Sequence, residues 1–163
     1  MKKKIIVIVI MLIIIGTATF LLLPKDNSDN KRFKNAYGNT IPKDTSIIYL
    51  TDDNIVESLS TQDKLIFIGS PASDNTKKAV PTLLKAAEDN GIDKIYYYDA
   101  TSIKEEINKV LTEKLNKEEI LLPTLFLLKD KKISELEEGL NKDIEAKYED
   151  IMIAYIMCNT PNC

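Results

Sequence analysis

The N-terminal segment limits the fold of this chain more than any other feature of the sequence. After Met1 and three lysines, a hydrophobic run extends from Ile5 to Leu23 and ends before Pro24. At about 1.5 Å per residue, a helix of this length crosses a bilayer hydrocarbon core of about 30 Å. The run therefore predicts a transmembrane anchor, with any globular domain confined to the residues after it.

The charges on either side of the run predict the direction in which the chain crosses the membrane. Three lysines precede the run, and acidic and polar residues follow it. The positive-inside bias then leaves residues 1–4 as a cytoplasmic stub and residues 25–163 outside. A cleaved signal peptide is the alternative, but its apolar core is shorter, and the small residues Thr17-Ala18-Thr19 lie within the run. We expect a single-pass, uncleaved anchor in contact with the bilayer.

The composition excludes several classes of function. The chain has no histidine and only two cysteines, which excludes Ser-His and Cys-His catalysis and any zinc site that uses histidine. Without the three leading lysines, 19 basic and 25 acidic side chains remain, and Arg32 is the only arginine. An acidic surface does not favour phosphate contacts. We therefore expect no nucleic-acid partner, no metal and no cofactor.

The remaining residues divide into a tether and one domain. Residues 24–45 mix Asn, Asp, Lys, Gly and Pro without periodicity, and predict a linker. From residue 46 to 163 the pattern predicts an α/β domain with a mixed sheet covered by helices on both faces. The predicted strands are 46–50, 65–69, 95–98, 121–128 and 132–134. The predicted helices are 53–60, 75–90, 103–115 and one from 142, the third opened by a Ser102–Glu105 capping box.

Three short motifs in this domain carry a resemblance to a known family. Gly69-Ser70-Pro71-Ala72 follows a buried strand, Pro81 lies within the next helix, and Pro123-Thr124 opens a later strand. This arrangement resembles thioredoxin-like proteins, and more narrowly the bacteriocin transport accessory type found outside the membrane of Gram-positive bacteria. The resemblance implies a three-layer thioredoxin-like sandwich in which a cis Pro123 faces the start of the helix.

The same resemblance implies that the redox site of the family is replaced in this chain. Family members carry C-x-x-C at the helix start, with a proline five residues after the second cysteine. Counting back from Pro81 places these two positions at Thr76 and Ser73, and a buried acid of the family falls on Phe67. Without a base, a hydroxyl cannot replace a thiolate nucleophile. We therefore expect Ser73 and Thr76 to cap the helix, and we expect no dithiol chemistry there.

A groove between this loop and the proline segment is the predicted binding site. The residues that would line it are Pro71, Ala72, Asp74, Asn75, Leu122, Pro123 and Thr124. The leading hypothesis is a non-catalytic binding or accessory module that holds a protein or an extended peptide outside the membrane. The resemblance implies a role in export or maturation of a secreted peptide or an envelope protein.

The C-terminal cysteines leave two other functions open. Cys158 and Cys163 can form a structural disulfide in an oxidising compartment, or they can be redox-active and make the chain a thiol-disulfide oxidoreductase. A structural envelope protein is the third hypothesis. The tyrosines at 96–98 are expected to pack in a sheet, and the mixed charges of residues 113–119 are expected to face solvent.

Overall fold

The computed structural model describes residues 28–61 and 63–158, so the predicted anchor Ile5–Leu23 lies outside the described residues. Within the described ranges, no helix combines the length and the apolar character needed to cross a bilayer. The fold described below therefore concerns the part of the chain that follows the predicted anchor.

The centre of the molecule is one mixed sheet of five strands in the order β1-β3-β2-β4-β5. The strands are β1 (Ser46–Leu50), β2 (Lys64–Gly69), β3 (Lys94–Asp99), β4 (Thr124–Lys129) and β5 (Lys132–Glu138). β1, β3 and β2 are parallel, whereas β4 is antiparallel to β2 and β5 is antiparallel to β4. The predicted mixed sheet is confirmed.

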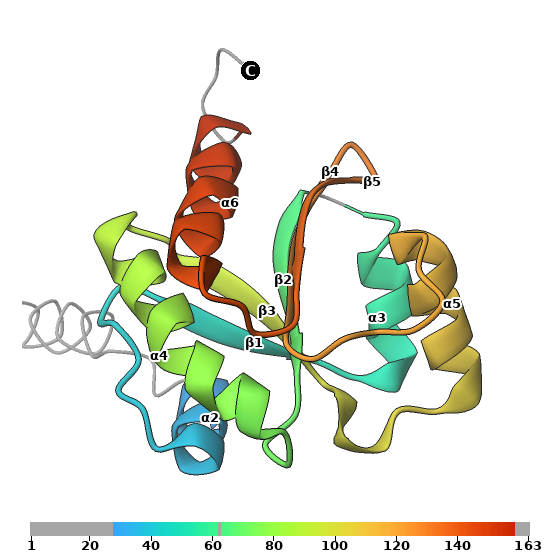
Figure 1. Cartoon of the computed structure of the whole chain (residues 1–163), viewed down its shortest axis with the longest axis horizontal. Helices are drawn as coiled ribbons and strands as arrows, with labels where there is room; N and C mark the ends of the chain where they lie inside the picture. Colours follow the sequence, from blue (N-terminus) through green and yellow to red (C-terminus); the bar gives the residue numbers. More distant parts are fainter. Residues whose placement is uncertain (1–27, 62, 159–163) are drawn as a thin grey trace, which may run out of the picture.

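Helices cover both faces of this sheet, as Figure 1 shows. They are α2 (Ser28–Tyr37), α3 (Asp52–Ser58), α4 (Asp74–Asp89), α5 (Glu105–Leu115) and α6 (Ile144–Cys158), with a short 3₁₀ turn, η1 (Ala100–Ser102). Side chains of α2, α4 and α6 share one core cluster, and those of α3 and α5 share the other. The architecture is a three-layer α/β sandwich.

β2 shows how the sequence determines these layers. Leu65 and Phe67 point into the core of α2, α4 and α6, whereas Ile66 and Ile68 point into the core of α3 and α5. All four side chains are fully buried. Because a central strand is covered on both faces, it reads as a continuous apolar run rather than as an alternating one.

Helix α2 differs from the linker predicted for residues 24–45. Phe33 on this helix is fully buried, and its ring packs edge-on against Tyr97 at a centroid distance of 5.1 Å. Phe33 is the only buried residue of α2, so the sequence shows no apolar stripe with helical spacing. Contacts with the sheet, rather than amphipathic periodicity, stabilise this helix.

Two other predicted boundaries also differ. Helix α5 begins at Glu105 after Lys104, without a side-chain cap, because Ser102 belongs to the preceding η1 turn. The predicted Ser102–Glu105 capping box is therefore wrong. β4 begins at Thr124 rather than at residue 121, since the residues before it are not part of the ladder.

Candidate functional site

The predicted site residues gather where three strands end or begin at one edge of the sheet. Gly69 at the end of β2 pairs with Asp99 at the end of β3, and Ile68 pairs with Thr124 at the start of β4. The loop after β2 therefore lies beside Pro123, which directly precedes β4. We call the surface formed by residues 70–76 and residues 121–123 the crevice.

Ser73 is the N-cap of α4, as the sequence predicts. Its hydroxyl oxygen accepts a hydrogen bond of 3.3 Å from the Thr76 backbone N–H. The exposed Asp74 carboxylate lies in the first turn, where it complements the helix dipole, and forms an ion pair of 3.5 Å with Lys77. The Ser73 hydroxyl therefore has a capping role.

Thr76 is buried beneath the loop and holds it in place. Its Oγ1 accepts a 3.3 Å hydrogen bond from the Ser70 backbone N–H. Its Cγ2 lies so close to Gly69 that a Cβ added there would approach it to 2.6 Å. Gly69 is thus required by the packing of Thr76, and the fully buried Phe67 lies next to the same glycine. Neither Thr76 nor Phe67 offers a proton-transfer group at the surface.

A chain of hydroxyl groups fixes the other side of the loop. Asp99 Oδ1 accepts hydrogen bonds from the Thr101 backbone N–H at 3.0 Å and from the Thr101 hydroxyl at 2.6 Å. Thr101 Oγ1 lies 2.7 Å from Ser70 Oγ, which accepts a bond from the Ala72 N–H at 3.1 Å. Since Thr101 donates to Asp99, the Ser70 hydroxyl donates to Thr101. The sequence analysis missed this network, although Asp99 is a carboxylate at the end of a predicted strand.

A second chain of hydrogen bonds reaches the crevice from α2. Burial raises the pKa of the Tyr97 and Tyr37 hydroxyls well above the usual value, so both stay protonated. Tyr97 donates to the Gly69 carbonyl at 3.2 Å, and Tyr37 donates to the Tyr97 hydroxyl at 2.6 Å. The sequence gave no signal for Tyr37, because it lies in the predicted linker. Tyr97 and Tyr98 are buried in the sheet, so the predicted packing role of this tyrosine strand is confirmed.

The opposite wall of the crevice is the segment before β4. The Leu122–Pro123 peptide bond is cis, as the resemblance predicts. Thr124 Oγ1 donates to the Leu121 carbonyl at 2.5 Å, and the Pro123 carbonyl accepts a 2.7 Å bond from the Gly139 N–H. These bonds fix both ends of the segment and leave the Leu121 side chain 48% exposed.

The exposure of the predicted groove residues is uneven. Pro123 and Thr124 are buried, and Pro71 and Leu122 are half-buried. The remaining three, Ala72, Asp74 and Asn75, are exposed. A partner in the crevice would therefore meet the Ala72–Asn75 turn on one side and Leu121 and Leu122 on the other. Leu121 is a site residue that the sequence analysis missed.

An ion pair lies behind the wall formed by residues 121–124. Lys117 Nζ lies 2.5 Å from Glu138 Oε2, and only 9% of the Glu138 side chain is exposed. Glu138 pairs across the ladder with Thr124. The other carboxylate oxygen, Oε1, is buried without a hydrogen-bond partner among the described residues. Lys117 thus has a specific partner, whereas the sequence predicted only a solvated run of charges at 113–119.

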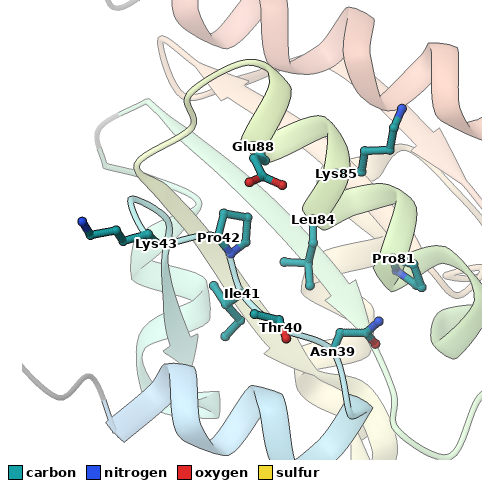
Figure 2. A pocket seen from close by; sticks show the side chains of 9 residues that line it. All are labelled: Asn39, Thr40, Ile41, Pro42, Lys43, Pro81, Leu84, Lys85 and Glu88. Carbon is teal, nitrogen blue, oxygen red and sulfur yellow. The ribbon is translucent and has the colours of Figure 1, made fainter.

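A separate hollow lies along the C-terminal half of α4, as Figure 2 shows. Its volume is about 450 Å³, and Ile41, Pro42 and Leu84 contribute apolar side chains to it. Lys85 on its rim already forms a 2.6 Å ion pair with Glu145. None of the predicted site residues lines this hollow, so it is not part of the crevice.

The predicted cysteine pair cannot be placed. The backbone of Cys158 ends α6, but Cys163 lies outside the described residues, and the pairing of the two thiols stays a prediction. The same holds for the anchor and for the direction of the chain across the membrane.

The layers and the strand order agree with the architecture that the resemblance implies. The fold is thioredoxin-like. No protein-family model and no curated protein matches the chain. Among solved structures, the chain is similar to thioredoxin f2 of Chlamydomonas reinhardtii, with 20% identity, a TM-score of 0.45, and coverage of 72% of this chain and 100% of that one.

Two further structures are similar at the same level. A Plasmodium falciparum thioredoxin has 13% identity and a TM-score of 0.47, over 66% of this chain and 98% of its own. A chain from a study of thiol resolution in a yeast mitochondrial 1-Cys peroxiredoxin has 18% identity and a TM-score of 0.47. The match covers 65% of this chain and 93% of that one.

Proposed function

We propose that this chain is a thioredoxin-fold binding module, anchored in the membrane with its domain outside, that holds an extended peptide or protein segment in the crevice. The finer proposal, taken from the resemblance, is an accessory role of the bacteriocin transport type, in export or maturation of a secreted peptide or envelope protein. The observation that carries the binding role is the exposed Leu121 side chain beside a loop whose polar groups already bond to one another.

The chemistry of the loop supports binding rather than catalysis. Ser73 and Thr76 occupy the two thiol positions of the resemblance, and both oxygens accept hydrogen bonds from backbone N–H groups. Neither has a neighbouring histidine, because the chain contains none. A hydroxyl without a base is almost un-ionised at neutral pH. The crevice therefore has no group that could attack a disulfide.

The two walls supply the contacts that an extended segment needs. In the turns and loops described, the Leu122 backbone neither donates nor accepts a hydrogen bond, although its neighbours Leu121 and Pro123 do. A peptide lying along the crevice can pair with Leu122 as an added strand does, while its side chains contact Leu121.

Site-specific photo-crosslinking of the full chain in its own cells tests the binding role. A photo-reactive residue at Leu121 and another at Asn75 probe the two walls, and Val56 on α3, which is 38% exposed, is the control position. We expect the same cross-linked partner from both walls and none from Val56. Identical adducts from Val56, or different partners from the two walls, would refute a shared binding crevice.

An insulin-reduction assay tests the alternative of an oxidoreductase that uses Cys158 and Cys163. The full chain and its Cys158→Ser/Cys163→Ser variant should both be inactive if the module only binds. Activity that disappears in the double variant would assign redox chemistry to the C-terminal pair and replace the binding proposal. If both assays fail, the structural envelope role remains.

A further inference from the structure

We propose that the C-terminal end of α6 is a second membrane contact, in which Ile153, Ile156 and Met157 insert into the interfacial layer of the bilayer. These side chains are 46%, 37% and 63% exposed. They are three of the six large hydrophobic residues exposed in the described part of the chain, and all three lie within one stretch of five residues. The inference rests on the membrane anchor of the proposed function.

The two halves of α6 differ in chemistry. The first half carries Glu145, Lys147, Glu149 and Asp150, whereas residues 151–163 contain no charged side chain. No Lys or Arg lies in the last turn of α6, as is also the case for α3 and α4. An uncharged, apolar helix end of this kind is suited to a medium other than water.

The first half of α6 is held by the domain, and the second half extends past it. Ile144, Tyr148, Ile151 and Met152 are buried in the cluster shared with α4 and the sheet. Figure 1 shows the last turns of α6 extending beyond α4. The exposed side chains therefore lie on turns of α6 that extend beyond α4.

The chain enters the domain on the same side of the sheet. Phe33 of α2 belongs to the same core cluster as Tyr148 and Met152 of α6. Only residues 24–27 separate the predicted anchor from Ser28, the first residue of α2. Five residue steps span at most about 17 Å. So short a connection keeps the start of α2 close to the bilayer to which the anchor is fixed.

The size of the apolar surface favours lipid over a second copy of the chain. A stable protein interface buries roughly 800 Å² on each partner. Three partly exposed side chains at one helix end fall well short of that area. A bilayer contact needs less area, because the anchor already supplies the attachment and the helix end only has to orient the domain.

The absence of tryptophan from the chain allows a direct test. The full chain carrying Met157→Trp is reconstituted into phosphatidylcholine vesicles with and without brominated acyl chains, which quench tryptophan fluorescence only on contact. The matched control is Val56→Trp, also an exposed apolar position, on the opposite face of the sheet. Flotation of the vesicles is measured first, because a chain that does not float with them refutes the anchor itself.

In chains that float, we expect the emission of the Met157→Trp variant to shift to shorter wavelength and to lose most of its intensity in brominated vesicles. The emission of the Val56→Trp variant should be unchanged. Adding Ile153→Ser and Ile156→Ser to Met157→Trp should abolish both effects. Equal emission from the two reporters would overturn the proposal while leaving the anchor intact. A blue shift without quenching would also overturn it, since it would show contact with a second copy or with residues 159–163.

Discussion

Two regions of the molecule use polar side chains at a helix start to bond backbone N–H groups, with different results. One is the crevice, and the other is the α2 corner, where Asp29, Asn30 and Phe33 of α2 lie against β1. In the first turn of α2, Asn30 Oδ1 accepts a 2.7 Å bond from the Ile47 N–H, and Asp29 Oδ2 accepts a 3.0 Å bond from the Tyr49 N–H. In the first turn of α4, Ser73 and Thr76 likewise accept bonds from backbone N–H groups. At both places, polar side chains at a helix start accept hydrogen bonds from backbone N–H groups.

The difference lies in what covers these bonds. At the α2 corner, the edge of β1 is closed, and Phe33 seals it with a fully buried ring. At the crevice, the loop is equally well bonded, but Ala72, Asp74 and Asn75 remain exposed. The α2 corner is thus closed by its own side chains, whereas the crevice keeps exposed side chains, which is the surface that the proposed binding role requires. Four substitutions test this division.

The largest expected effect is that of Phe33→Ala at the α2 corner. Removing a fully buried ring leaves a cavity beside Tyr97, and such substitutions cost about 3–5 kcal/mol of unfolding free energy. Urea denaturation of the variant measures this loss. The matched control is Lys31→Ala, an exposed position of α2 that should change stability by no more than about 0.5 kcal/mol. A similar small change for Phe33→Ala would mean that α2 is a dispensable part of the tether.

The next effect is that of Asn30→Ala, which removes both bonds of this side chain to the β1 edge. Asn30 also donates from Nδ2 to the Thr45 carbonyl at 3.1 Å. Loss of these two bonds should cost about 1–3 kcal/mol. Hydrogen exchange should show faster exchange at the Ile47 amide. Asn35→Ala, at an exposed position of the same helix, should leave that amide protected, and equal exchange in both variants would contradict the role of Asn30.

A smaller effect is expected for Ser73→Ala at the crevice. Loss of the N-cap should cost about 1 kcal/mol, as is typical for such positions. Cross-linking from Leu121 should persist, because the other bonds of the loop remain. Ser102→Ala is the control, because Ser102 does not cap α5 and the variant should lose no such bond. Loss of cross-linking with normal stability would show that the Ser73 hydroxyl contacts the partner.

The smallest effect is expected for Tyr37→Phe, which breaks the link between the two regions. The Tyr97 bond to the Gly69 carbonyl remains, so the cost should be at most about 1 kcal/mol. Amide chemical shifts of Gly69 and Ser70 should nevertheless move. Tyr96→Phe is the control, since its hydroxyl bonds to no described residue. Shifts at Gly69 in both variants, or in neither, would show that α2 does not act on the crevice.

The sequence predicted the layers of the fold well because each layer follows from residue patterns within single segments of the chain. Buried strands read as apolar runs, and the spacing of Gly69, Pro81 and Pro123 predicted a loop at the start of α4 and a cis proline before β4, which the structure has. The cap at Ser73 was predicted because a Ser directly before a helix is a strong local signal. Its hydroxyl can accept a hydrogen bond from the backbone N–H three residues later.

The missed features all depend on contacts between distant segments. Phe33 and Tyr37 carry no pattern in a polar stretch, and only the sheet against which they pack makes α2 a helix. The Ser70–Thr101 contact joins loops 31 residues apart, and Lys117 meets Glu138 across the start of β4. No single stretch of sequence contains both members of such pairs, so local reasoning could not find them.

The position of α2 at the entry to the domain has a mechanical consequence. A pull on the chain from its N-terminal side reaches the sheet only through α2. There, the side chains of Asp29 and Asn30 accept hydrogen bonds from the backbone of β1, and the buried Phe33 ring lies on the same helix. The pull is thus spread over several bonds on an edge strand, and the hydrogen bonds from Tyr37 to Tyr97 and from Tyr97 to Gly69 connect α2 to the loop after β2. We therefore expect tension on α2 to reach the crevice through this connection.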